Sequence, residues 1–219
     1  MRRLQVLMGA AILVAGLAPA SHAVVRRGPV PLLWQRTAVS GYLGKGLPVG
    51  EFSDSRKDPT TGSPLFGNQE SGAVDWAVEI EHFVGHTASL GFSYANTEYN
   101  DKDLGDSLKT KVSTASGFIR VVVPTATAIR PYLRFGMGGV QVEFLDPTSR
   151  EDSEWEFSLQ AGGGLLWLPT RWMGLSAQAL YYHGDTSDSV VFATSEETVV
   201  VGFNVEYWAF SAGLSLFFP

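Results

Sequence analysis

The chain has 219 residues and a formal net charge of −6, with 45% hydrophobic and only 17% charged residues. Intrinsic disorder is excluded, because it requires low hydrophobicity and high charge. The lack of cysteine excludes disulfide scaffolds, thiolate metal sites and cysteine nucleophiles. The 24 glycines and the aromatic content of 12% indicate an all-β protein.

The first segment has the features of an export signal. A short basic start, Met1–Arg3, precedes the apolar stretch Val6–Leu17, and Ser21–Ala23 offers the small residues that a signal peptidase recognises. The apolar stretch is short for a membrane-spanning helix. We therefore expect a signal peptide over residues 1–23.

The rest of the sequence alternates between apolar and polar residues with period two, which predicts β-strands. Trp155–Trp167 is the clearest stretch, with large apolar residues on one face and small or polar residues on the other. Changes of parity at Gly138–Gly139 and near Glu206 predict β-bulges. No helix is expected after residue 23. The predicted strands are Thr37–Val49, Val74–Glu81, Ala88–Ala95, Lys111–Val123, Ile129–Phe144, Trp155–Trp167, Met173–Tyr181 and Trp208–Phe218.

The predicted connections between the strands are of two kinds, which alternate. Three are short turns, Val84–Thr87, Pro124–Ala128 and Leu168–Arg171. Short turns at one end and long loops at the other are typical of outer-membrane barrels, in which the short turns are periplasmic. The long polar connections are Glu51–Gly72, Thr97–Lys109, Asp146–Glu154 and Gly184–Thr198.

The apolar face is predicted to lie outside. A soluble lipocalin-like barrel is the alternative, because it alternates in the same way with its apolar face inward. The polar face here is small and suits a narrow lumen. Trp155 and Trp167 would lie roughly 30 Å apart along the membrane normal, close to the spacing of two aromatic girdles. The predicted girdle residues are Trp155, Trp167, Trp172, Trp208 and Phe218.

The lumen of an eight-stranded barrel is only wide enough for its own side chains. Buried charges persist there when they are paired and hydrogen-bonded, so we expect a salt-bridge network that fills the lumen. A narrow gated cation path is the alternative. The predicted lumen residues are Lys45, Asp75, Glu79, Glu81, Arg120, Arg134, Glu156, Gln160 and Gln178.

The four long connections are acidic, with 16 of the 22 acidic residues and five basic residues. Such a surface repels nucleic acid and attracts cations. Solvated loops that keep the barrel soluble during transit are the simpler explanation of this charge. Asp101–Asp106 alternates carboxylates in the manner of a calcium loop but lacks the third ligand and the closing glutamate. We expect neither a metal nor a cofactor.

One cluster of residues bears on catalysis. Asp185 lies two residues after His183. The eight-stranded lipid A deacylases have a serine at that distance from the histidine. The pattern fails, and we predict that the protein is not an enzyme.

Three segments carry a resemblance: Gly41–Asp54, Arg130–Gly139 and Ala212–Phe218. On these the chain resembles the eight-stranded outer-membrane β-barrel family that includes the OmpA-type transmembrane domain and OmpX-like proteins. The resemblance implies an eight-stranded antiparallel up-and-down transmembrane barrel. It also implies contact with outer-membrane lipid and lipopolysaccharide. By the same resemblance, Phe218 is the terminal aromatic residue that the barrel-assembly machinery would recognise.

We therefore predict a periplasmic lead-in over residues 24–36 and a barrel over residues 37–219, in the outer membrane of a Gram-negative cell. The expected role is structural or interactive, through acidic extracellular loops, in a monomer that binds no nucleic acid. The alternatives are a small porin-like channel, an outer-leaflet lipid-modifying enzyme, and a soluble lipocalin-like barrel that binds an apolar ligand.

Overall fold

The computed structural model describes residues 33–53, 56–57, 64–66, 73–101, 105–145, 150–152, 154–194 and 197–219. The predicted signal peptide, residues 1–23, lies outside the described residues, as does most of the predicted lead-in. The described end of the lead-in reaches the first hairpin. There Gln35 donates a backbone hydrogen bond of 3.0 Å to Phe83, whose own amide donates one of 2.8 Å to Arg36.

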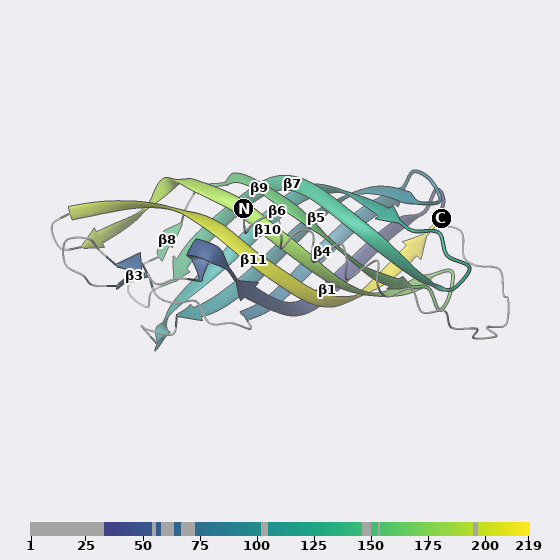
Figure 1. Cartoon of the computed structure of the whole chain (residues 1–219), viewed down its shortest axis with the longest axis horizontal. Coiled ribbons are helices and arrows are strands. Elements are labelled where there is room, and N and C mark those ends of the chain that lie inside the picture. The colour runs from purple at the N-terminus through teal and green to yellow at the C-terminus, as the bar shows by residue number, and fades with distance from the viewer. Residues whose placement is uncertain are drawn as a thin grey trace.

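In the described part of the chain, eight long strands form one antiparallel sheet that closes on itself (Figure 1). Each strand pairs with the next long strand, and the pairing of the first with the last completes the ring. The predicted eight-stranded up-and-down barrel is therefore confirmed. The strands are β1 (Thr37–Pro48), β4 (Ala73–Phe83), β5 (Ala88–Asp101), β6 (Gly105–Val122), β7 (Ile129–Leu145), β9 (Glu156–Trp167), β10 (Met173–Thr194) and β11 (Glu197–Phe218).

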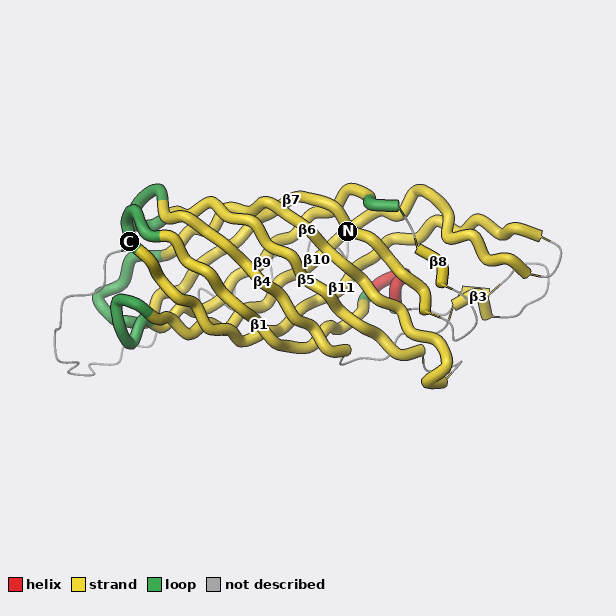
Figure 2. The backbone as a smooth tube through the Cα atoms, turned by 180° about the vertical axis from the view of Figure 1, so that it is seen from behind, coloured by secondary structure: helices red, strands yellow, loops and turns green. Residues whose placement is uncertain are grey.

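The two ends of the barrel differ. At one, which we name the turn end, the strands are joined by tight turns over residues 84–87, 123–128 and 168–172, beside the C-terminus (Figure 2). The opposite end, the loop end, carries the short elements η1 (Gly50–Phe52), β2 (Arg56–Lys57), β3 (Pro64–Phe66) and β8 (Arg150–Asp152). Within the described residues, no helix has the length and hydropathy needed to cross a membrane.

Two of the predicted long loops are largely strand. β5 and β6 continue to Asp101 and from Gly105, and β10 and β11 remain paired as far as Thr194 and Glu197. The last hairpin therefore extends well beyond the barrel wall (Figure 1). Alternation did not reveal these extensions, because beyond a membrane neither face of a strand has to be apolar.

Both predicted bulges are wrong. The register of β7 with β6 and β9 runs without a break through Gly138 and Gly139, and that of β11 with β10 runs through Glu206. The apparent change of parity in β7 has a simple cause: Val140 and Val142 point inward, into an apolar part of the lumen. A register shift does occur in β10, between Thr186 and Val190.

The outward face of the sheet is apolar, the reverse of a soluble lipocalin-like barrel. On β4 the alternation is complete: Val74, Val78 and Ile80 are exposed, whereas Glu79 and Glu81 are buried. The sequence therefore forms a barrel whose exterior suits hydrocarbon and whose interior is polar.

Candidate functional site

The centre of the lumen holds four charged side chains. Arg120 and Arg134 are direct cross-strand partners on β6 and β7, and β4 presents Glu79 and Glu81 toward them. Glu79 joins the two arginines: Arg120 Nη2 donates to its Oε2 at 2.9 Å, and Arg134 Nη1 donates to its Oε1. Arg120 Nη1 also donates to Glu81. The two guanidinium groups and two carboxylates are formally neutral together, which is the condition for burying them.

Hydroxyl and amide groups add further hydrogen bonds, which involve side chains from every barrel strand. Ser89 donates to Glu81 at 2.6 Å, and Arg134 donates to Ser93 at 2.8 Å. These bonds give many buried polar groups a partner within the lumen, while Arg120 Nε, Arg134 Nε and Gln160 Oε1 have none among the described residues. The other hydrogen bonds of the network join Arg120 with Tyr42, Ser176 with Tyr42, Ser93 with Ser116, Gln160 with Ser116, Tyr132 with Gln178, and Gln178 with Ser211.

Aromatic rings pack against the arginines. The guanidinium carbon of Arg134 lies 3.9 Å from the ring centroid of Phe118, and that of Arg120 lies 4.6 Å from that of Tyr132. Both rings lie over a glycine directly opposite on the next strand, Gly91 for Phe118 and Gly164 for Tyr132. Glycine is required there because a Cβ would occupy the space of the ring, an arrangement that also pins the strand register.

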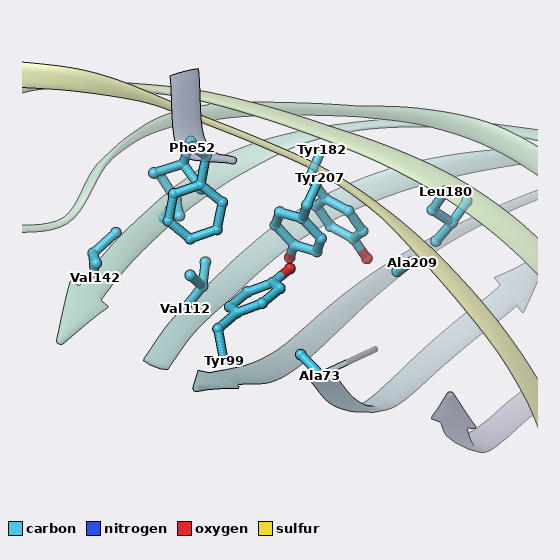
Figure 3. Close-up of a cluster of buried hydrophobic side chains, with 11 residues drawn as sticks. Phe52, Ala73, Tyr99, Val112, Val142, Leu180, Tyr182, Tyr207 and Ala209 are labelled. Carbon is cyan, nitrogen blue, oxygen red and sulfur yellow. The ribbon is translucent and has the colours of Figure 1, made fainter. Parts of the chain in front are cut away.

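Apolar clusters fill the lumen on either side of the network. The loop-end plug includes Phe52 from η1, which lies edge-on to Tyr99, and the rings of Tyr182 and Tyr207 stack at 4.7 Å (Figure 3). The loop-end plug consists of Phe52, Ala73, Tyr99, Val112, Val140, Val142, Leu180, Tyr182, Val205, Tyr207 and Ala209. The turn-end plug consists of Leu33, Ala38, Phe83, Val122, Tyr132, Leu166, Leu168 and Phe217.

Most of the predicted lumen residues lie inside. The structure brings together Glu79, Glu81, Arg120 and Arg134 in one cluster. Asp75 is buried apart from that cluster and accepts a hydrogen bond of 2.8 Å from Thr97. Gln160 and Gln178 are buried members of the hydrogen-bond network, and Glu156 is half-buried on the same face of β9.

The assignment of Lys45 to the lumen is wrong. On β1 the inward residues include Tyr42 and Gly46, so Leu43 and Lys45 face outward, and both are exposed. The three glycines of β1 leave neither of its faces clearly apolar, which is why the sequence pattern was ambiguous there. Sequence reasoning also missed Tyr42, Phe118 and Tyr132 as lumen residues, although Phe118 and Tyr132 alternate in phase with the inward Arg120 and Arg134 on their own strands.

The predicted girdle residues lie on the outer face, at both ends of the apolar surface. Trp167, Trp172 and Phe218 are about half exposed near the turn end. Trp155 and the less exposed Trp208 lie toward the loop end. The prediction omitted four further residues that extend these girdles: Trp34, Trp76, Tyr94 and Tyr181.

His183 has a carboxylate partner, but not the one the sequence suggested. Its Nδ1 lies 3.1 Å from Oε1 of Glu206, directly across from it on β11, on the outer face. The side chain of Asp185 lies outside the described residues. Among the residues the structure describes, no group of three histidine or acidic side chains could hold a metal ion.

Solved structures of small outer-membrane barrels have the same fold. Neisserial surface protein A aligns with a TM-score of 0.57 at 12% identity, over 84% of this chain and 96% of that one. The outer membrane protein AlkL, solved in lipid bilayers, aligns with a TM-score of 0.57 at 14% identity, over 92% and 97%. OprG from Pseudomonas aeruginosa aligns with a TM-score of 0.53 at 14% identity, over 86% and 98%.

No protein-family model matches the sequence, and no curated protein matches it. The structural similarities establish the fold alone at these identities. They confirm, at the level of the fold, the resemblance to eight-stranded outer-membrane barrels.

Proposed function

We propose that the protein is an outer-membrane barrel without catalytic activity, which holds acidic segments at the cell surface on a closed platform. The observation that carries this proposal is the filled lumen. A solute crossing the barrel would have to displace the loop-end plug, the Arg–Glu network and the turn-end plug in turn. A porin-like channel is therefore the weaker candidate.

The location in the outer membrane is supported by three features. The exterior is apolar between two aromatic girdles, the structural neighbours are outer-membrane barrels, and residues 1–23 have the pattern of an export signal. Phe218 ends β11 on the lipid-facing side, where the barrel-assembly machinery would read a terminal aromatic residue. In this orientation the loop end faces outward from the cell.

The surface role is supported by charge. The connections at the loop end are acidic in sequence, and a surface of one sign attracts partners of the other. A lipid-modifying activity has less support, because Asp185 stands where the lipid A deacylases place a serine, and His183 lies beside the carboxylate of Glu206.

Two measurements test this proposal. The precursor, expressed in a Gram-negative host, should appear in the outer-membrane fraction and shift on SDS gels after boiling, because a closed barrel keeps its backbone hydrogen bonds in detergent. Soluble periplasmic protein without a shift would contradict the location.

Cells displaying the protein should bind a cationic peptide, and the triple variant Asp101→Asn, Asp103→Asn, Asp106→Asn should bind it less. Binding that is equal in both, or unaffected by salt, would contradict the surface role.

A further inference from the structure

A shallow apolar groove lies on the outer face of the barrel, across β4, β1, β11 and β10. Its volume is about 660 Å³. The groove exists because Gly41, which faces outward, has no side chain to fill it: a Cβ built there meets nothing within 4 Å. Its walls include Leu43, Trp76, Val78 and Leu214.

A single cation stands at the loop-end side of this groove. Lys45 follows Leu43 on the outward face of β1, opposite Val74 on β4 and Phe210 on β11. It is exposed, and none of the described residues forms a hydrogen bond or ion pair with it. Its direct cross-strand neighbours on the outer face, Val74 and Phe210, are both apolar.

An ammonium group in this position needs an anion or water, because a charge facing hydrocarbon is costly. The aromatic residues beside it, Trp76 and Trp208, mark the level at which lipid headgroups begin. The side chain of Lys45 can therefore reach the headgroup layer while its methylenes stay among apolar neighbours. Toward the turn end from Lys45, the groove offers an apolar surface around Gly41.

We propose that Lys45 and this groove bind one molecule of a phosphorylated glycolipid of the lipid A type. Its phosphate pairs with Lys45 Nζ and one of its acyl chains lies over Gly41. The chemistry follows from the two parts of the site, since the cation selects a phosphate and the groove selects a chain. The choice of lipid rests on the proposed outer-membrane orientation, in which the loop end lies in the outer leaflet.

The test uses the folded barrel in detergent micelles, with lipid A added as the probe and bound lipid counted by native mass spectrometry. The wild type should retain one lipid A. Lys45→Gln should bind roughly tenfold more weakly, because it loses a charge-assisted hydrogen bond, and Lys45→Arg should keep most of the binding. Gly41→Leu should also weaken binding by filling the groove, and it should fold normally because its Cβ enters open space.

Lys109→Gln is the matched control, since Lys109 is also exposed and outward but lies on β6, away from the groove. It should bind lipid A as the wild type does. Equal binding by wild type, Lys45→Gln and Gly41→Leu would overturn the proposal, as would equal retention of phosphatidylcholine or phosphatidylglycerol. These outcomes are separate from failure of the outer-membrane location, which membrane fractionation and the heat-dependent gel shift detect on their own.

Discussion

The middle and the ends of the lumen are filled in opposite ways. In the middle, Arg120 and Arg134 are neutralised by Glu79 and Glu81 in fixed hydrogen-bond geometry. At the ends, plugs of aromatic and aliphatic side chains fill the lumen mainly by packing. A charged network fails when one partner is lost, because the remaining charges stay buried. An apolar plug weakens in proportion to the volume removed. The two regions therefore make different predictions for substitutions of similar size.

The largest effect is expected at Glu79. Glu79→Gln keeps the size of the side chain but leaves two adjacent buried arginines with Glu81 as the remaining carboxylate of the cluster. We expect a loss of about 3–5 kcal/mol in the free energy of unfolding, measured by urea titration in lipid vesicles. The double variant Glu79→Gln, Arg134→Met should recover part of it. A loss below about 1 kcal/mol would mean that water or another group already compensates the arginines.

A turn-end substitution should cost somewhat less. Phe83 is fully buried and packs against Phe217 with ring centroids 6.1 Å apart. Phe83→Ala should lower the free energy of unfolding by about 3 kcal/mol, and Phe83→Leu by clearly less, because the cost follows the cavity left behind. Equal costs for the two variants would contradict a plug held together by packing.

Two glycines on opposite faces of neighbouring strands sharpen the contrast between inside and outside. A Cβ on Gly213 would meet the ring of Tyr42, its direct partner across β1 and β11, whereas one on Gly41 meets open space. Gly213→Ala should therefore cost about 1–3 kcal/mol by overpacking, and Gly41→Ala should stay within about 0.5 kcal/mol. Thermal unfolding of the pair in the same detergent would measure the difference. The reverse order would contradict the register described for β1.

The smallest effect is expected at His183. Its contact with Glu206 is half-exposed on the outer face, where ion pairs contribute little. His183→Ala should change the free energy of unfolding by less than about 1 kcal/mol, in the urea titration used for Glu79. A loss comparable to that of Glu79→Gln would give this pair a structural role that its exposure does not suggest.

The contrast between regions also explains which features could be predicted from the sequence. β4 was predictable because its inward residues are acidic and its outward ones large and apolar. β7 was misread because Val140 and Val142, apolar residues, point inward into the loop-end plug. Alternation with period two shows that a strand has two faces, and in a membrane barrel the apolar face is expected to point to the lipid. Where an apolar plug fills the lumen, inward residues are apolar as well, and this expectation fails. Lys45 was misassigned for a related reason, since the glycines of β1 carry no information about which face is apolar.

The length of the β10–β11 hairpin could not be predicted by the same argument. Beyond the girdles both faces of a strand meet water, so no hydrophobic pattern marks where pairing stops. The sequence predicted that Arg120 and Arg134 pair with inward carboxylates. It did not predict which carboxylates, because the partners depend on the cross-strand register, which brings the two arginines side by side on β6 and β7.

Conductance across a planar lipid bilayer tests the closed lumen most directly. The purified wild-type barrel, inserted beside an open porin as a positive control, should give no current steps above those of detergent blanks. That result is expected because the network and both plugs occupy the path. Discrete, reproducible openings of the wild-type protein would contradict the closed lumen, and would establish the channel as the better description of its function.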